Sequence, residues 1–274
     1  MLFDTHCHLD SGHFPEGADA VLERARDGGV RAFACIGVGS LELSREAVAL
    51  AERRPDVVAT VGVHPHDANG FSPELEAELE ALVQGERVVA FGEVGLDYHY
   101  DHSSRETQRD VFRRSIALAR RVGKPLVIHT REAPTDTLGV LEEEGARDVG
   151  GIIHCFSEDR AFAARALDLG FFLSFSGILT FKNALAIKDV AAWAPEDRVL
   201  VETDSPYLAP VPLRGKRCEP SLVVHTARHL AELRGVSEER VAELTRDNAA
   251  RAFRLVLTEE SGRVRLDIRD PARP

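Results

Sequence analysis

The sequence contains few cysteines and no paired cysteine motif. Its four cysteines are Cys7, Cys35, Cys155 and Cys218, and no Cys-x-x-Cys pair occurs. Four widely spaced thiols are too few to cross-link a chain of 274 residues, and a zinc site made only of cysteines needs closer pairs. We therefore exclude a disulfide scaffold and an all-cysteine metal site, and we expect reduced, mostly buried thiols.

The sequence also lacks a long apolar run and an excess of basic residues. No apolar run approaches the roughly 18 residues that a membrane helix needs, and the N-terminal MLFDTHCHLD has no basic segment leading into an apolar one. We expect a soluble, cytoplasmic protein without membrane contact, and no partner protein is indicated. Lys and Arg total 34 against 45 Asp and Glu, a formal charge of −11. This balance argues against a broad surface for duplex nucleic acid, because nonspecific duplex binding depends on many basic contacts.

What the sequence does contain is a regular alternation of short apolar segments with longer stretches of helical period. Repeated strand–helix units predict a parallel sheet, and eight of them favour closure into an α/β fold, the (β/α)8 TIM barrel. The helical stretches include Ser72–Gln84, which begins with a suitable N-cap followed by proline, and Arg105–Val122. The expected strands are Leu2–His6, Arg31–Val38, Val57–Val63, Val88–Val94, Leu126–His129, Gly151–Cys155, Phe171–Ser174 and Val199–Glu202.

The alternative fold is an open doubly wound sheet. Eight parallel strands would be long for such a sheet, and no G-x-G-x-x-G follows the first strand. The 44% hydrophobic content suits one large core, and no internal repeat beyond the strand–helix unit and no linker marks a second domain. The sequence therefore predicts a single-domain barrel.

The region after the eighth strand begins with a basic, proline-containing loop, Pro210–Glu219. Two helical stretches follow, at about Leu222–Leu233 and Ser237–Leu255. The last residues, SGRVRLDIRDPARP, are charged and contain proline, which is typical of a surface tail. We expect the barrel to span residues 1–258 and a charged C-terminal tail to span residues 259–274.

Ionisable residues stand at the ends of five predicted strands, where parallel strands buried on both faces should be apolar. Because the carboxyl ends of barrel strands converge on one face, these side chains should share one cavity. Taken singly, each has an ordinary interpretation as a core histidine, a helix cap or an ion-pair partner. Their joint placement favours a metal site. The six residues are His6, His8, Glu93, His129, His154 and Asp204.

The types of ligand narrow the choice of metal. His6 and His8 are two residues apart in a strand and face the same way, so both can bind one ion. Imidazole and carboxylate ligands suit Zn, Mn or Fe, and the carboxylates leave Mg possible. Six ligands exceed the three or four of a single catalytic zinc. We therefore expect two divalent metal ions (Mg, Mn or Zn), with Glu93 as the bridge and Asp204 as the general base.

Five motifs make the sequence similar to a known family. DTHCHLD at residues 4–10, GVHPHDA at 62–68, GEVGLDYH at 92–99, HCFS at 154–157 and ETDSPYLAP at 202–210 resemble the TatD family of metal-dependent deoxyribonucleases, in the same order. The resemblance covers about residues 1–255. It implies an amidohydrolase-like TIM barrel, a deoxyribonuclease dependent on a divalent metal, and the same six metal ligands.

Several further residues are candidates for substrate binding. Arg214, Lys216 and Arg217 form a basic cluster soon after Asp204, His64 and His66 follow the third strand, and Arg131 follows His129. The ordinary alternatives are a solvated charged loop and helix caps. Tyr98 and His99 could contact a base, although packing explains Tyr98 as well. The segment PVPLRGKRCEP differs from the family's common PVPHRGKRNEP at Leu213 and Cys218, which bears on substrate preference.

These observations favour the hydrolysis of phosphodiester bonds, most of all by a deoxyribonuclease that acts as an exonuclease on single-stranded DNA ends through a metal-activated water. A barrel mouth is a pocket, and it suits a single-stranded end better than the interior of a duplex. One alternative is a metal-dependent hydrolase of an ester or amide such as D-aminoacyl-tRNA, because the same six ligands would serve it. A non-enzymatic metal-binding scaffold is the other alternative, but it would need a lost ligand or filled coordination positions.

Overall fold

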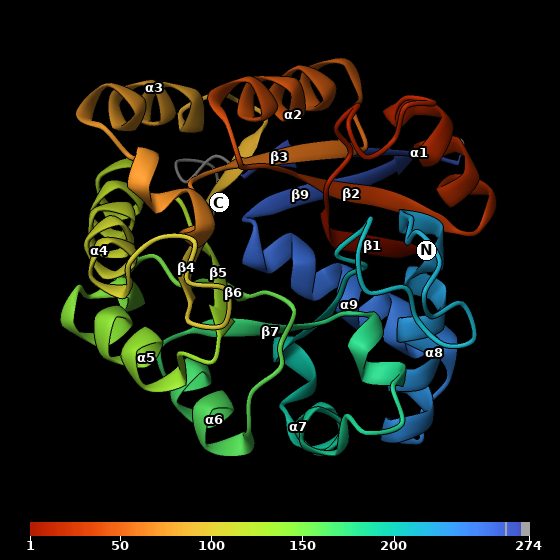
Figure 1. Cartoon of the computed structure of the whole chain (residues 1–274). Coiled ribbons are helices and arrows are strands. Elements are labelled where there is room, and N and C mark those ends of the chain that lie inside the picture. The colour runs from red at the N-terminus through yellow and green to blue at the C-terminus, as the bar shows by residue number, and fades with distance from the viewer. Residues whose placement is uncertain (261, 270–274) are drawn as a thin grey trace.

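In the computed structural model, which describes residues 1–260 and 262–269, eight parallel strands form one sheet in the order of the chain. Helices alternate with the strands and surround them, as Figure 1 shows. This arrangement confirms the predicted (β/α)8 barrel. The strands are β1 (Leu2–Cys7), β2 (Val30–Gly37), β3 (Val57–Val61), β4 (Val88–Asp97), β5 (Leu126–Arg131), β6 (Gly151–Ile153), β7 (Phe171–Phe175) and β8 (Val199–Val201).

The first and last strands meet at their carboxyl ends. A parallel bridge joins Cys7 to Ser205, and the backbone N–H of His8 donates to the carbonyl of Ser205 at 2.8 Å. One step earlier, the N–H of Asp204 donates to the carbonyl of His6 at 2.9 Å. These bonds nearly close the barrel and place the residues after β8 beside those at the end of β1.

The helices begin and end where local chemistry predicts. Ser72 caps α3 by accepting the N–H of Leu75 at 3.2 Å, and Gly123 ends α4 in the left-handed conformation at φ 68°. The helices are α1 (Ala18–Asp27), α2 (Leu41–Arg53), α3 (Pro73–Val83), α4 (Arg105–Val122), α5 (Pro134–Glu143), α6 (Arg160–Asp168), α7 (Leu185–Trp193), α8 (Val223–Arg234) and α9 (Glu238–Ala252).

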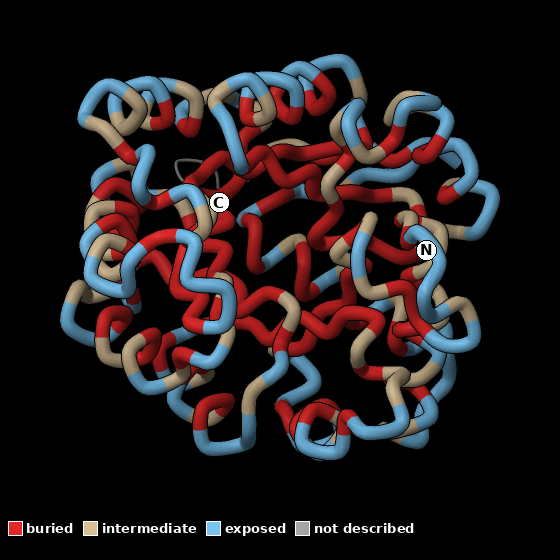
Figure 2. Tube along the Cα trace, viewed as in Figure 1, coloured by how far each residue is buried: buried red, intermediate tan, exposed pale blue. Residues whose placement is uncertain are grey.

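Two buried clusters make up the core. The larger lies between the strands and the surrounding helices, and Figure 2 shows the strands buried while the outer sides of the helices are exposed. The smaller cluster fills the amino-terminal end of the barrel. There Phe3 packs against Phe253, which follows α9, with ring centroids 6.0 Å apart. The amino-terminal end is thus packed with apolar side chains, whereas the other end carries the polar groups described below.

The charged segment after residue 258 differs from the predicted surface tail. Strands β9 (Leu255–Glu260) and β10 (Arg263–Ile268) pair antiparallel, and Val264 and Leu266 are buried in the smaller cluster. Their side chains alternate with charged ones, so one face of β10 meets the barrel while the other carries Arg263 and Arg265. Much of the segment therefore packs on the barrel; residues 261 and 270–274, also assigned to the predicted tail, lie outside the described residues.

Within the described ranges, the structure contains no helix long and apolar enough to cross a membrane.

Candidate metal centre

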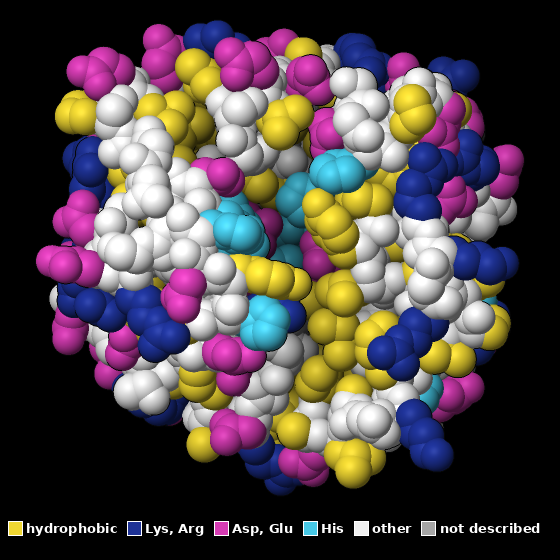
Figure 3. Space-filling view, viewed as in Figure 1, with side chains coloured by type: hydrophobic (Ala, Val, Ile, Leu, Met, Phe, Trp, Pro, Cys, Tyr) yellow, Lys and Arg dark blue, Asp and Glu magenta, His cyan; other side chains and the backbone are white. Residues whose placement is uncertain are grey.

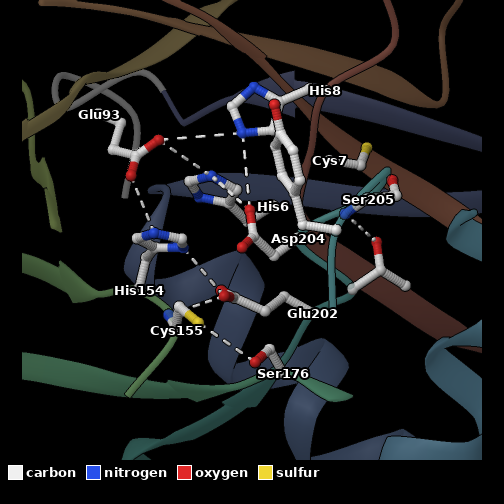
Figure 4. A network of polar contacts seen from close by, with 12 residues as sticks. His6, Cys7, His8, Glu93, His154, Cys155, Ser176, Glu202, Asp204 and Ser205 are labelled. Carbon is white, nitrogen blue, oxygen red and sulfur yellow. Dashed lines mark hydrogen bonds and ion pairs between the residues drawn. The ribbon is translucent and has the colours of Figure 1, made fainter. Parts of the chain in front are cut away.

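The six predicted ligands gather at the carboxyl end of the barrel. His6 lies in β1 and His8 directly after it, Glu93 in β4, His129 in β5, His154 after β6 and Asp204 after β8. Figure 3 shows histidine and acidic side chains at the bottom of a hollow in this face, and Figure 4 shows several of them pointing toward one another. The structure thus brings together the residues that the sequence placed at the strand ends.

Glu93 lies between two sets of imidazoles. Its Oε2 is 3.4 Å from Nε2 of His6 and 3.9 Å from Nε2 of His8. Its Oε1 is 2.9 Å from Nδ1 of His129 and 2.9 Å from Nε2 of His154. Each carboxylate oxygen therefore faces a separate pair of imidazole nitrogens, which is an arrangement suited to a carboxylate between two cations.

The path of β4 places Glu93 in this position. The pairing of β4 with β5 shifts register between Gly92 and Val94, so Glu93 is left out of the regular ladder. Gly95 has φ 145°, and a Cβ at this position would collide with the carbonyl of His129. The glycine lets β4 run close to β5, which brings Glu93 against His129.

Asp204 completes the group from the opposite side of the barrel. Its Oδ1 is 3.6 Å from Nε2 of His8 and 3.8 Å from Nε2 of His6. Its φ of 57° turns the chain at the end of β8, and the side chain keeps 13% of its surface exposed. His6 and His8 therefore lie between the carboxylates of Glu93 and Asp204.

The electrostatics of the cluster favour positive charge among the carboxylates. Burial alone would raise the pKa of Glu93, but His154 and His64 hold it well below its usual value. Burial would also raise the pKa of Asp204, but the neighbouring imidazole of His8, 3.6 Å away, lowers it. Both carboxylates are thus ionised at neutral pH. They stabilise positive charge between them, either as protons on imidazoles or as cations.

The buried nitrogens of His6 test whether the residues fit a metal ion. Its side chain is fully buried, and among the described residues neither Nδ1 nor Nε2 has a hydrogen-bond partner. A buried polar group without a partner costs about 1–3 kcal/mol. Because Nε2 points between the carboxylates of Glu93 and Asp204, a divalent cation there would satisfy it. The donor set therefore fits divalent metal ions.

Sequence reasoning missed the role of Glu202. Its carboxylate is fully buried, and its Oε1 accepts the backbone N–H of Cys155 at 2.7 Å and lies 3.0 Å from Nδ1 of His154. This contact orients the ring of His154 so that Nε2 faces Glu93. Its position could have identified it, because Glu202 is an ionisable residue at the end of the eighth predicted strand, two positions before Asp204.

Asp97 is a second missed residue. Its Oδ2 lies 3.0 Å from Nε2 of His66 and 3.2 Å from Nε2 of His129. Burial would raise the pKa of Asp97, but hydrogen bonds from His129 and from backbone N–H groups lower it, so the carboxylate is ionised. Glu93 and Asp97 are four positions apart in β4 and share one face, which is the pattern that could have found it.

His64 and His66 lie at the cavity with the metal-ligand candidates. His64 follows β3, and its Nε2 is 3.6 Å from Oε1 of Glu93; burial lowers its pKa to about 3, so it is neutral and able to bind a cation. Both histidines and Arg131 line a cavity of about 1020 Å³ that also contains the six candidates apart from the fully buried His6. Three of the six predicted substrate contacts thus reach the site.

The other three predicted contacts do not line the part of the cavity formed by described residues. Arg214 lies over the ring of Phe181, with 4.4 Å from Cζ to the ring centroid. Arg217 pairs with Glu16 and lies 4.7 Å over the ring of Phe14. Lys216 is exposed on the same loop. All three side chains are exposed, and Glu16 neutralises part of the charge of the loop.

Tyr98 does not face the cavity. It is 9% exposed, and its hydroxyl donates to Asp136 at 2.6 Å while accepting from Arg109 at 3.1 Å. Packing and hydrogen bonds to the Arg109–Asp136 ion pair therefore explain Tyr98. His99 lies on the surface, where its Nδ1 is 2.7 Å from the carboxylate of Glu132.

A parallel barrel with a cluster of histidines and carboxylates at its carboxyl end defines a class of metal-dependent hydrolases, and the comparisons with known proteins agree. A sequence model of the family described as TatD related DNase matches residues 3–254. The chain therefore belongs to this family.

Individual relatives cover nearly the whole chain. The metal-dependent hydrolase YabD of Bacillus subtilis, named as uncharacterized, is 43% identical over 93% of this chain and 100% of its own. A protein of Pantoea vagans named as the 3'-5' ssDNA/RNA exonuclease TatD is 35% identical over 93% of this chain and 100% of its own. The crystal structure of the TatD homologue YjjV from Escherichia coli has a TM-score of 0.85 and 28% identity, and covers 91% of this chain and 96% of its own.

Proposed function

We propose that this metal-dependent hydrolase is a phosphodiesterase that removes nucleotides from the ends of single-stranded DNA with the help of two divalent ions (Mg, Mn or Zn). The observation that carries the proposal is the position of Glu93, whose two oxygens face two separate sets of imidazoles. His6, His8 and Asp204 would hold one ion with Oε2, and His129 and His154 would hold the other with Oε1.

When bound, the ions would neutralise charge on the phosphate and lower the pKa of the attacking water. Asp204 accepts the proton of that water, because its carboxylate is ionised and partly open to the cavity. The water oxygen attacks phosphorus, the bond from phosphorus to the leaving sugar oxygen breaks, and that oxygen takes up the proton that Asp204 accepted. Glu93 stays ionised and holds its place through its contacts with His129 and His154.

His64, His66 and Arg131 are the proposed donors to the phosphate oxygens, since all three line the cavity. Arg214, Lys216 and Arg217 stand outside the cavity, and we assign them to the backbone of a longer strand that leaves the mouth. A single-stranded end is favoured because the hollow is a pocket and the chain carries a charge of −11. The name of the Pantoea relative, a 3'-5' ssDNA/RNA exonuclease, supports the same choice.

The test uses metal-stripped protein and an end-labelled single-stranded oligonucleotide, with Mg, Mn or Zn added back separately. We expect stepwise shortening that needs metal and is lost in Asp204→Asn and Glu93→Gln. Asp189→Asn is the matched control, because its carboxylate lies on α7, is 57% exposed and pairs with Arg160. The direction of shortening gives the polarity of cleavage.

Two results would overturn the proposal. Cleavage of a circular single strand as fast as a linear one would rule out an exonuclease. No cleavage with any metal, despite full metal binding, would move the assignment to an ester or amide such as D-aminoacyl-tRNA.

A further inference from the structure

Two exposed tyrosines stand at the cavity and take no part in the proposed metal binding. Tyr100 is 50% exposed and Tyr207 is 51% exposed, and both line the cavity that holds the metal centre. A tyrosine ring offers a large apolar face together with a polar hydroxyl. Their exposure beside the site is therefore suited to a ligand that covers them.

The two tyrosines belong to opposite sides of the barrel mouth. Tyr100 follows β4 and Tyr207 follows β8, and these strands are four places apart in the eight-stranded order. Glu93 on β4 and Asp204 after β8 mark the metal centre between them. A DNA strand with one phosphate at the metal centre can therefore extend toward one tyrosine on each side of that phosphate.

Neighbouring side chains hold the ring of Tyr100. His66 packs edge-on against it at 5.5 Å, the guanidinium of Arg131 lies over one face of the ring at 4.7 Å from its centroid, and the ring of His102 is stacked with it at 5.7 Å. The backbone N–H of Tyr100 donates to Asp97 at 3.1 Å. Because these contacts restrict the ring before any ligand arrives, stacking on it costs little conformational entropy.

Tyr207 is held by a chain of hydrogen bonds. Its hydroxyl oxygen is 3.1 Å from Nε2 of His13, whose Nδ1 is 2.6 Å from Asp10. The ring meets that of His8 at a steep angle, with centroids 6.1 Å apart. The hydroxyl is thus engaged at the rim, while half of the residue's surface stays exposed.

We propose that Tyr100 and Tyr207 are the stacking positions for the two nucleobases that flank the scissile phosphate. This inference rests on the proposed nuclease function and names how that site selects its substrate. Every base has a π face, so stacking is tolerant of sequence. In a duplex the bases already stack on one another, so only an unpaired strand can offer them to the two rings. Stacking also adds affinity to the few backbone contacts that a chain with a charge of −11 offers.

The test pairs each tyrosine with one base. Thymidine oligonucleotides are made with an abasic sugar on one side or the other of the terminal phosphodiester, and kcat/KM is measured for the wild type, Tyr100→Ala and Tyr207→Ala. For the wild type, loss of either base should lower kcat/KM about tenfold. In each alanine variant, loss of the base that faces the missing tyrosine should have almost no further effect, while loss of the other base keeps its full effect.

Two sets of control variants complete the design. Tyr100→Phe and Tyr207→Phe keep a stacking ring and should retain most of the wild-type kcat/KM. Trp193→Ala removes an aromatic that is 39% exposed on α7 and does not line the cavity, and it should leave the ratio between substrates unchanged.

The outcomes separate the two proposals. If the wild type cleaves the oligonucleotides and an abasic sugar lowers kcat/KM equally in the wild type and in all variants, the stacking proposal is wrong. The proposed nuclease function would not be affected by this result. If the wild type cuts neither the complete nor the abasic oligonucleotide, the nuclease function fails and the stacking positions fail with it.

Discussion

The imidazole rings of His6 and His154 are stacked, with centroids 3.7 Å apart and planes 15° apart. Burial lowers the pKa of His6, and the neighbouring His154 lowers it further. Burial opposes a charge on His154 as well, but Glu93 and Glu202 raise its pKa well above the usual value. Two protons on stacked rings would repel each other. A bound cation therefore supplies positive charge beside Glu93 better than a proton on each ring does.

Removal of metal should lower the stability of the folded chain. A ligand at 100 times its Kd stabilises the folded state by about 2.7 kcal/mol. We expect the unfolding midpoint in a calorimeter to fall in chelator and to recover with Mn or Zn. The difference in midpoint between metal-bound and metal-free protein should be much smaller for Glu93→Gln than for the wild type. For Asp189→Asn it should equal the wild-type difference. Identical midpoints with and without metal would contradict a metal centre built on Glu93.

Glu202 should affect metal binding without touching the metal. Glu202→Ala leaves Nδ1 of His154 and the N–H of Cys155 without their acceptor, so His154 loses its orientation. Loss of such a supporting contact typically lowers metal affinity by about 10- to 100-fold. Glu202→Gln keeps an acceptor oxygen and should lose less metal affinity than Glu202→Ala. Titration with a competing metal indicator measures both variants, and equal affinity of Glu202→Ala and wild type would exclude the positioning role.

Arg131 and Arg214 should differ in their effect on a short substrate. Arg131 lines the cavity, whereas Arg214 packs on Phe181 outside it. With a dinucleotide-length substrate, we expect Arg131→Gln to lower kcat/KM about tenfold, as loss of a charged hydrogen bond worth about 1.5 kcal/mol does. Arg214→Gln should stay within about twofold. A larger loss in Arg214→Gln would show that the basic loop reaches the reacting phosphate.

The sequence predicted the barrel and the composition of the cluster because both depend on local patterns. Apolar runs mark buried parallel strands, and the ionisable residues at their ends must converge once the strands form a barrel. The same logic applied to Asp97 and Glu202, but nothing local separates a ligand from a residue that orients one. That distinction depends on which imidazole each carboxylate faces across strands.

Local sequence patterns did not predict the direction of the basic loop. Its position after β8 predicted that Arg217 would lie near Asp204. The distance along the chain does not determine the direction of a loop. Arg217 pairs instead with Glu16, which lies 201 positions earlier in the sequence. Such a pairing follows from the folded arrangement of the basic loop and the segment between β1 and α1, which the sequence pattern does not encode.

The hairpin of β9 and β10 should contribute to the stability of the barrel rather than hang from it as a tail. The alternation of charged and apolar residues around Val264 and Leu266 is typical of a strand with one buried face, and Leu266 is fully buried with Phe3 and Phe253. Leu266→Ala should lower the free energy of unfolding by about 2–5 kcal/mol.

The control is Val256→Ala in the paired strand β9, because Val256 is 43% exposed and should change the free energy by no more than about 0.5 kcal/mol. Urea unfolding followed by circular dichroism measures both variants. If the two substitutions have equally small effects, the hairpin is an appendage. If Leu266→Ala alone destabilises the whole transition, the hairpin unfolds together with the barrel, and the amino-terminal end of the barrel depends on it for closure.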